Sequence, residues 1–190
     1  MARNPYNKQI GNRNFLSATS FKFNLAKCPK VDFFSNSCNI PGLSLPVAVQ
    51  PTYLNDIPRP GDRLDFEDFT LRFLIDENLE NLMEIQKWMR GLGYPESVAE
   101  ALKLTSGAMK FEDQETDNPD YNTSDGTLSI LNSSQNAKFM VKFSDLFPVA
   151  MTGMDFDATE DDTAYFTAQV TFKFTLYEIV DVYGQPLYES

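Results

Sequence analysis

The sequence contains no histidine among its 190 residues. This absence excludes His-based acid–base catalysis, Ser-His-Asp and Cys-His nucleophile pairs, and His metal ligands. The chain also has no glycine-rich phosphate-binding loop of either standard type. Carboxylate catalysis remains open, with Asp65, Glu67 and Asp68 as candidates by residue type only. We interpret these three residues as a solvated turn or as partners in ion pairs, and we expect no enzyme.

Cysteine is scarce, since Cys28 and Cys38 are the only two. Two cysteines do not form a disulfide framework, so we expect free thiols and an intracellular protein. No apolar run approaches the roughly 18 residues that a membrane span requires. The first residues lead into polar sequence without the apolar core of a signal peptide. We therefore expect neither secretion nor membrane insertion by this chain.

Positive charge is in deficit, because 16 Lys and Arg residues stand against 27 Asp and Glu residues, for a net charge of −11. Such a chain is a poor candidate for gripping nucleic acid, since phosphate contacts need Lys and Arg. An acidic surface serves solubility, and it does not exclude a surface past which DNA moves without sticking. The acidic segment 105–135 does not fit a calcium loop, because Asp125 stands where Gly is needed and Leu131 where Glu is needed. We expect no metal and no cofactor.

The chain is rich in aromatic residues, which make up 13% of it and include sixteen Phe. Short segments of alternating apolar and polar residues predict a mainly β fold of antiparallel strands with one flanking helix. The expected strands are 21–25, 31–39, 43–54, 69–75, 138–143, 149–156 and 166–177. Pro46 and Pro51 confine the third of these to an edge or an irregular ribbon. A turn region is expected at 55–62, and a break at Leu146-Phe147-Pro148.

One segment, 79–92, is strongly periodic and predicts the helix, with Asp76 and Asn78 as candidate caps. Its expected apolar face consists of Leu79, Leu82, Met83, Ile85, Met89 and Leu92. Gly91, Gly93 and Pro95 end the helix. Trp88 lies beside the apolar face, and we expect it to be a buried anchor.

The last predicted strand alternates without interruption over twelve residues. Its expected dry face carries Phe166, Ala168, Val170, Phe172, Phe174 and Leu176, and its wet face carries Thr167, Gln169, Thr171, Lys173, Thr175 and Tyr177. The wet face carries mostly Thr rather than charged residues, and such a face could contact either bulk solvent or the lumen of a tube. We expect an N-terminal arm at 1–17 and one β domain at 18–190. That domain would contain an inserted loop at about 104–136, with candidate strands at 108–112 and 127–131.

The order of several short motifs resembles one known family. The motifs are Gly61-Asp62-Arg63, Phe66, Glu67-Asp68-Phe69-Thr70, Trp88 near the helix end, Phe147-Pro148, Gly153 and the long terminal strand. Together they resemble the tail tube protein of contractile-tailed bacteriophages, which is related to the inner-tube protein of type VI secretion. The resemblance covers about 20–180 apart from the insertion.

The resemblance implies a β-sandwich of two packed antiparallel sheets rolled towards a barrel. It also implies homo-hexameric rings that stack into a tube inside a tail sheath, in contact with baseplate and tail terminator proteins, in a virion tail assembled in the host cytoplasm. Phage DNA would cross an acidic lumen without specific binding, with Thr167, Gln169, Thr171, Lys173 and Thr175 on the lumen face. A hairpin loop at 43–62 would carry the ring and stacking contacts, through Leu43, Leu45, Pro46, Tyr53, Leu54, Pro60, Gly61, Asp62 and Arg63.

Other interpretations stay open. The chain could be a tube initiator or terminator paralogue at the end of the tail. It could instead be a monomeric binding module, such as a carbohydrate-binding β-sandwich, which would need exposed aromatic residues on one concave face. The last strand offers only Tyr165 and Tyr177 for that purpose. A carboxylate enzyme would need two carboxyl groups about 5–10 Å apart in a cleft, and nothing in the sequence indicates such a pair.

Overall fold

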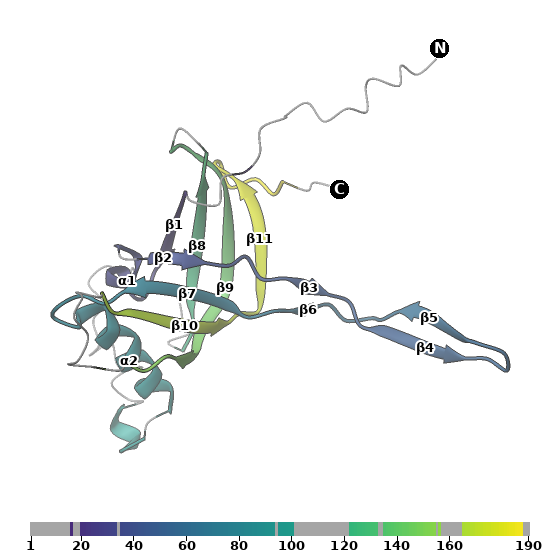
Figure 1. Cartoon of the computed structure of the whole chain (residues 1–190), viewed down its shortest axis with the longest axis horizontal. Helices are drawn as coiled ribbons and strands as arrows, with labels where there is room; N and C mark the ends of the chain where they lie inside the picture. The colour runs from purple at the N-terminus through teal and green to yellow at the C-terminus, as the bar shows by residue number, and fades with distance from the viewer. Residues whose placement is uncertain are drawn as a thin grey trace, which may run out of the picture.

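A computed structural model describes residues 16, 20–33, 35–93, 95–100, 122–132, 135–154, 156 and 165–187 (Figure 1). Its elements, in chain order, are β1 (Phe21–Leu25), α1 (Pro29–Phe33), β2 (Ser35–Cys38), β3 (Leu43–Ser44), β4 (Val47–Pro51), β5 (Asp56–Pro60), β6 (Asp65–Phe66), β7 (Phe69–Leu74), α2 (Glu80–Gly93), β8 (Ser124–Leu131), β9 (Ala137–Met151), β10 (Thr167–Lys173) and β11 (Leu176–Asp181).

The body is a seven-stranded antiparallel sheet in the order β1-β8-β9-β10-β7-β2, with β11 also paired to β9. The long strand β9 belongs to two halves that pack on each other. We call β1, β8, β11 and the first part of β9 the first sheet, and β10, β7, β2 and the last part of β9 the second sheet. In Figure 1 the strands of the first sheet run across those of the second. The predicted fold of two packed antiparallel sheets is confirmed.

The bend of β9 has a local cause at Asp145, whose φ is 58°. The register against β8 shifts there, between the pairs Gly126↔Phe143 and Ser124↔Leu146, which marks a β-bulge. A second shift lies opposite β10, where Pro148 pairs with Phe172. Proline is tolerated in a strand at a bulge. The prediction that Leu146-Phe147-Pro148 breaks the strand is therefore wrong, because β9 continues through it.

The core lies between the two sheets and is built from aromatic rings. Phe69 of β7 lies at its centre, with ring centroids 5.1 Å from Phe23, 4.7 Å from Phe143 and 6.0 Å from Phe172. All four side chains are fully buried. The alternation of β1, β7, β9 and β10 places one Phe from each strand on the inner face, which is why the sequence pattern predicts the core well.

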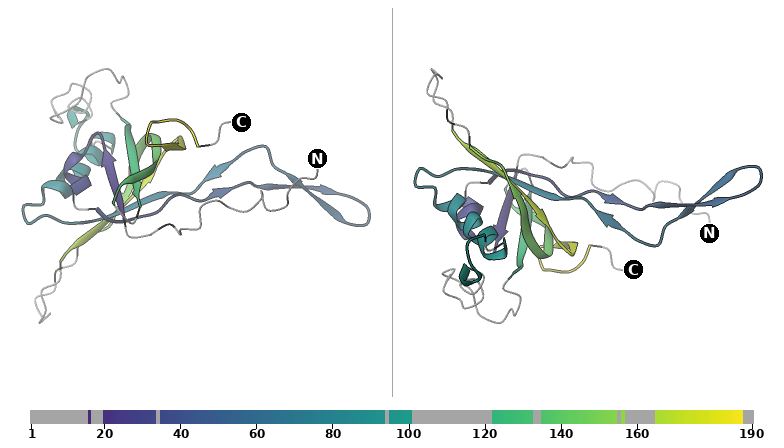
Figure 2. Two further views of the ribbon diagram at one scale, coloured as in Figure 1. Left: turned by 90° about the horizontal axis from the view of Figure 1, so that it is seen from above. Right: turned by 90° about the horizontal axis from the view of Figure 1, so that it is seen from below.

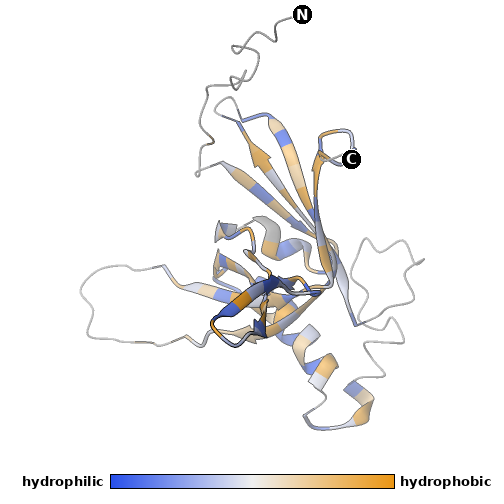
Figure 3. Ribbon diagram, turned by 90° about the vertical axis from the view of Figure 1, so that its right-hand side faces the viewer, coloured by the Kyte–Doolittle hydropathy of each residue, from blue (hydrophilic) through white to orange (hydrophobic). Residues whose placement is uncertain are grey.

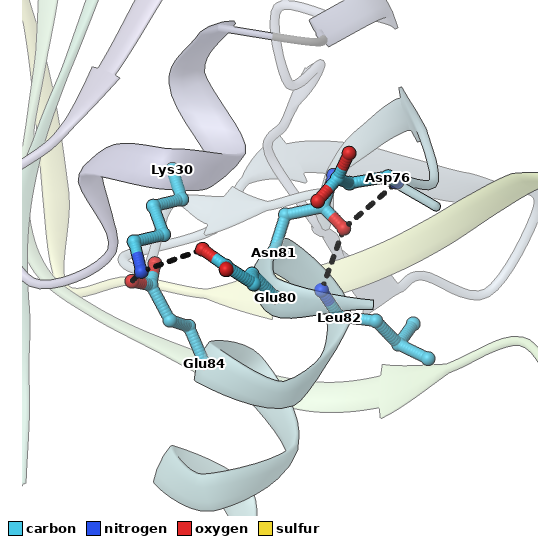
Figure 4. A network of polar contacts seen from close by, with 6 residues as sticks. All are labelled: Lys30, Asp76, Glu80, Asn81, Leu82 and Glu84. Carbon is cyan, nitrogen blue, oxygen red and sulfur yellow. Dashed lines mark hydrogen bonds and ion pairs between the residues drawn. The ribbon is translucent and has the colours of Figure 1, made fainter. Parts of the chain in front are cut away.

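The helix α2 covers one end of this core, with Leu82, Ile85 and Trp88 buried. Leu79 and Met83 are 37% and 41% exposed, so the predicted apolar face is too wide. The start of α2 depends on Asn81, which is 1% exposed. Its Nδ2 donates to the carbonyl of Leu74, and its Oδ1 accepts from the backbone N–H groups of Asp76 and Leu82 (Figure 4).

The segment after β1 is helical, contrary to the predicted strand at 31–39. Pro29 opens α1, where its missing N–H costs nothing, and Val31 is buried. Lys30 ties α1 to α2, because its Nζ lies 2.9 Å from Glu80 Oε2 and 3.9 Å from Glu84 Oε1 (Figure 4). Only Ser35–Cys38 of the predicted segment is a strand, β2.

The predicted final strand at 166–177 is also wrong, because it is two strands. β10 ends at Lys173, and after Phe174 and Thr175 the chain crosses to the first sheet, where β11 pairs with β9. Beyond the crossing, side chains that were expected inside point outward, and those expected outside point inward. Leu176 is 44% exposed. Tyr177 packs inward instead, with its ring centroid 5.6 Å from that of Phe66 and 5.9 Å from that of Phe143.

The predicted insertion at 104–136 contains a body strand. β8 lies between β1 and β9, so the expected strand at 127–131 is present but is not part of an inserted loop. The expected strand at 108–112 lies outside the described residues. So does the predicted N-terminal arm, apart from Leu16.

Candidate functional site

A projecting hairpin leaves the body between β2 and β7 (Figures 1 and 2). It comprises residues 43–66, with β3 paired to β6 near the body and β4 paired to β5 farther out. Its turn is at Thr52–Asn55, where the N–H of Thr52 donates to the carbonyl of Asn55 over 3.2 Å. The predicted ribbon is confirmed, whereas the turn expected at 55–62 is wrong because Asp56–Pro60 is strand β5.

The projecting hairpin exposes almost all of its side chains. Exposed large apolar residues in it are Leu43, Leu45, Val47, Val49, Tyr53, Leu54, Ile57 and Leu64, with Tyr53 fully exposed. The other predicted contact residues Pro46, Pro60, Asp62 and Arg63 are exposed too, and Gly61 is half-buried. A two-stranded ribbon is marginal in water by itself, and an exposed apolar area of this kind marks an interaction surface.

The two faces of the ribbon differ. Val47 pairs with Pro60 and Val49 with Pro58, which gives one face that is apolar apart from Asp56, the partner of Pro51 next to the turn. The opposite face carries Ala48 with Arg59 and Gln50 with Ile57. On that face Arg59 Nε donates to Gln50 Oε1 over 3.1 Å. Figure 3 views the hairpin end-on and shows polar and apolar residues interleaved along it.

Prolines block the outer edge of β5. The N–H of Gly61 donates to the carbonyl of Pro46 over 2.8 Å, so Pro46 and Gly61 form a hydrogen-bonded pair. Hydrogen-bonded and non-hydrogen-bonded pairs alternate along an antiparallel ladder. The pairs that contain Pro60 and Pro58 therefore have no cross-strand hydrogen bonds. The N–H groups of such pairs point outward, and proline has none. Another strand therefore cannot add along β5 at these positions, whereas Val47 and Val49 on the β4 edge keep their outward N–H groups.

The second sheet presents a polar outer face. Ala168, Val170 and Phe172 of β10 are fully buried. The predicted lumen residues Thr167, Gln169, Thr171 and Lys173 alternate with them and so point away from the core. Thr175 is exposed but lies beyond β10, in the crossing to β11. The outer face continues onto β7, where Thr70 pairs with Thr171 and Arg72 with Gln169.

The charge of this face differs from the acidic lumen that the resemblance implies. Its strands contain no Asp or Glu, and their charged residues are Arg72 and Lys173. Arg72 Nε and Nη2 donate to Thr167 Oγ1 over 3.1 and 2.9 Å, while Lys173 pairs with Asp68. The excess carboxylates of the chain therefore lie outside the strands of this face.

The second sheet has two open edges in the described part of the chain. β2 ends it on one side, and residues 147–151 of β9 end it on the other. Phe147 and Val149 are 37% and 50% exposed at the latter edge. In the first sheet, the chain folds back over the end of β11 with a bridge between Val180 and Pro186, and β1 forms the other edge. Unpaired edges are ready to pair with another chain.

The other residues of the family motifs pack or form hydrogen bonds within the body of the protein. Phe66 is half-buried against Phe174 and Tyr177. Thr70 donates through its N–H and Oγ1 to Asn39 Oδ1, over 2.6 and 3.0 Å. Pro148 is buried, whereas a Cβ on Gly153 would meet open space. No periodicity signals the roles of Asn39 or Asn81, because each depends on backbone groups of a neighbouring segment.

Trp88 is a buried anchor, as predicted. Its side chain is 0% exposed, and its Nε1 donates to the carbonyl of Asn122 over 3.0 Å. Lys27 Nζ lies 5.0 Å from the ring centroid, in cation–π geometry. Lys27 is 3% exposed, and this burial lowers its pKa to about 8. The sequence does not reveal this contact, since Lys27 and Trp88 lie far apart in the chain.

The described residues contain no cluster of three possible metal ligands. Both cysteines are free, and burial raises the pKa of the Cys28 thiol strongly and that of Cys38 to about 11. Across the ranges that the structure describes, no three Cys, Asp or Glu side chains gather as metal ligands. No helix in those ranges has the length and apolar character needed to cross a membrane. The distinctive surfaces are thus the projecting hairpin and the second sheet.

Comparison with known proteins agrees with this geometry. Residues 3–180 match the family model described as phage tail tube protein. The tail tube terminator protein of Enterobacteria phage T4 is 26% identical over 151 residues, which cover 76% of each chain.

Two solved structures share the fold. One is the tube-terminating cap of the anti-feeding prophage, with a TM-score of 0.56, 15% identity and coverage of 95% of this chain and 100% of that one. The other is the extended sheath–tube complex of PVC, an extracellular contractile injection system, with a TM-score of 0.54, 16% identity and the same coverage. The family and these relatives are structural parts of contractile tails and injection systems, and this chain belongs to the phage tail tube protein family.

Proposed function

We propose that this chain is a structural, non-enzymatic subunit of a phage tail tube, in which six copies close into a ring whose lumen conducts DNA during ejection. The observation that carries the proposal is the second sheet, which has two open edges, a dry inner face and a polar outer face. Pairing β2 of one copy with residues 147–151 of β9 in the next copy satisfies both edges. The outer face, with Thr167, Gln169 and Thr171, then lines the lumen.

The projecting hairpin supports the stacking of rings. Residues 43–66 contain three Asp and two Arg, so the hairpin has a net charge of only −1 in a chain of net charge −11. An apolar segment with so little net charge contacts a second copy with little of the like-charge repulsion that acidic surfaces would cause. The apolar face of Val47, Val49, Pro58 and Pro60 is the proposed contact with the neighbouring ring.

The tail also supplies the proposed partners. We expect a sheath protein around the tube, a baseplate protein at one end and a terminator at the other, in a virion tail assembled in the host cytoplasm. The PVC relative is part of a sheath–tube complex, and another similar chain lies in the anti-feeding prophage baseplate. These likenesses support the proposal only through the shared fold.

A second candidate is the ring that ends the tube. The relative in phage T4 is a tail tube terminator, at 26% identity over 151 residues. A terminator would close into one ring but would not continue into a long tube. Counting copies by quantitative mass spectrometry of purified virions separates the two, because a repeating subunit is present in many rings and a terminator in one.

Electron microscopy of the purified protein over a concentration series, with light scattering for mass, tests the proposal. Hollow six-fold rings support it, stacks favour the repeating subunit, and single rings favour the terminator. A monomer at every concentration, even with a purified tail end added as a template, would contradict it.

The hairpin is tested with two matched double variants. Val47→Asp with Val49→Asp places charge on the apolar face, and Ala48→Asp with Gln50→Asp places the same charge on the opposite face. We expect only the first pair to abolish stacking while single rings persist. Equal loss from both pairs would contradict a role for the apolar face.

A further inference from the structure

One polar row crosses the outer face of the second sheet. Ser37 of β2 pairs with Arg72 of β7, and Arg72 pairs with Gln169 of β10. Thr152 follows β9 and exchanges hydrogen bonds with Gln169, because its N–H donates to the Gln169 carbonyl and its Oγ1 accepts from the Gln169 N–H, both over 2.9 Å. We call Ser37, Arg72, Gln169 and Thr152 the polar row. All four residues are exposed.

Arg72 gives the polar row its charge. Two of its nitrogens donate to Thr167 Oγ1, so the guanidinium is held along the sheet, and its other N–H groups remain for a ligand. The neighbours in the row are neutral, and no Asp or Glu occurs in the four strand segments of this sheet. The other cation, Lys173, is neutralised by its pairing with Asp68.

We infer that the polar row binds the phosphate backbone of duplex DNA, with Arg72 as the main contact. This rests on the proposed ring, in which six copies of the row join into a belt around the lumen. Arg, Ser, Thr and Gln side chains are the groups that contact phosphates, and such contacts carry no sequence information. The belt attracts DNA through the charge of Arg72 at one height of the lumen, while the protein as a whole is acidic. The binding is therefore weak and salt-dependent.

The test compares Arg72→Gln with Lys22→Gln. Both changes remove one positive charge, but Lys22 lies exposed on β1 of the first sheet. Rings of each protein are titrated against a fluorescent duplex of about 30 base pairs, and binding is followed by anisotropy over a salt series. We expect Arg72→Gln to weaken binding at low salt. The slope of log K against log salt should fall by about one for each phosphate that the ring no longer neutralises. Lys22→Gln should match the wild type.

Electron microscopy of the same samples separates this inference from the proposed function. Intact Arg72→Gln rings with reduced DNA binding support the inference. Intact rings whose affinity and salt slope equal those of Lys22→Gln overturn it and leave the ring in place. A wild-type chain that forms no rings overturns both, because the rows then have no lumen to join.

Discussion

The backbone N–H of Gly61 donates to the carbonyl of Pro46 over 2.8 Å, and a Cβ on Gly61 would overlap that same carbonyl oxygen. This hydrogen bond joins the two strands of the hairpin at the inner end of the β4–β5 pair, on the side that faces β3–β6 and the body. Only glycine allows this approach, because the obstacle is backbone and cannot move aside as a side chain would.

Gly61→Ala is therefore expected to distort the projecting hairpin and leave the body intact. Thermal unfolding of the body should shift little, since Phe66, which packs against Phe174 and Tyr177, lies at the base of the hairpin on the body side of Gly61. Stacking of rings, scored by electron microscopy, should be abolished. Gly153→Ala is the matched control, because its Cβ would meet nothing within 4 Å. Normal stacking of Gly61→Ala would show that the close approach to Pro46 is dispensable.

Phe172→Asp is expected to prevent folding. Phe172 is 0% exposed between Phe69 and Trp88, and an unpaired carboxylate there costs several kcal/mol, on the scale of a whole domain's stability of about 5–15 kcal/mol. Phe174→Asp should also destabilise the fold, although less, because Phe174 is partly buried. Circular dichroism and solubility provide the measurement.

Thr171→Lys tests the other face of the same strand. The side chain points away from the core, so the variant should fold with nearly unchanged stability. In rings, the added cations should slow the passage of DNA, which single-turnover translocation or the anisotropy titration would detect. If Thr171→Lys unfolds the protein and Phe172→Asp does not, the inner and outer faces of β10 are the reverse of those described.

Trp88→Phe removes the hydrogen bond to the Asn122 carbonyl and weakens the interaction with Lys27. The carbonyl is only partly buried, so loss of this hydrogen bond should lower the free energy of unfolding by about 0.5–1.5 kcal/mol. Urea denaturation followed by circular dichroism measures the change. Tyr53→Phe in the exposed turn is the control and should change stability little. A difference under about 0.5 kcal/mol would indicate that water replaces the indole.

Lys27 predicts a pH dependence of stability. Burial lowers its pKa in the folded state to about 8 from the ordinary 10.5. Between these values the unfolded state binds more protons, so the free energy of unfolding rises with pH across pH 8–10.5, by on the order of 2 kcal/mol in total.

The rise in the free energy of unfolding is measured by comparison with Lys27→Met, which has no ionisable side chain at position 27 and should not show it. Both proteins should carry Cys28→Ala and Cys38→Ala, because burial raises the pKa of each thiol, and ionisation of these thiols in the unfolded state acts in the opposite direction. Parallel pH profiles for the two proteins would mean that Lys27 is hydrated in the folded state.

The sequence determined the local elements. Alternation placed Phe69, Phe172 and their neighbours in the core, helical periodicity located α2, and the prolines at 46 and 51 marked an irregular ribbon. These features follow from side-chain period and from missing N–H groups, which any short segment displays by itself. The family was also readable from the order of such segments.

The tertiary structure decided what depends on contacts between distant segments. The bulge at Asp145 lets β9 serve two sheets, which split the apparent last strand into β10 and β11 and turned Tyr177 inward. The register of β2, β7 and β10 gathered Ser37, Arg72 and Gln169 into one row. Neither a bulge nor a register can be read from alternation, because both are set by the partner strand.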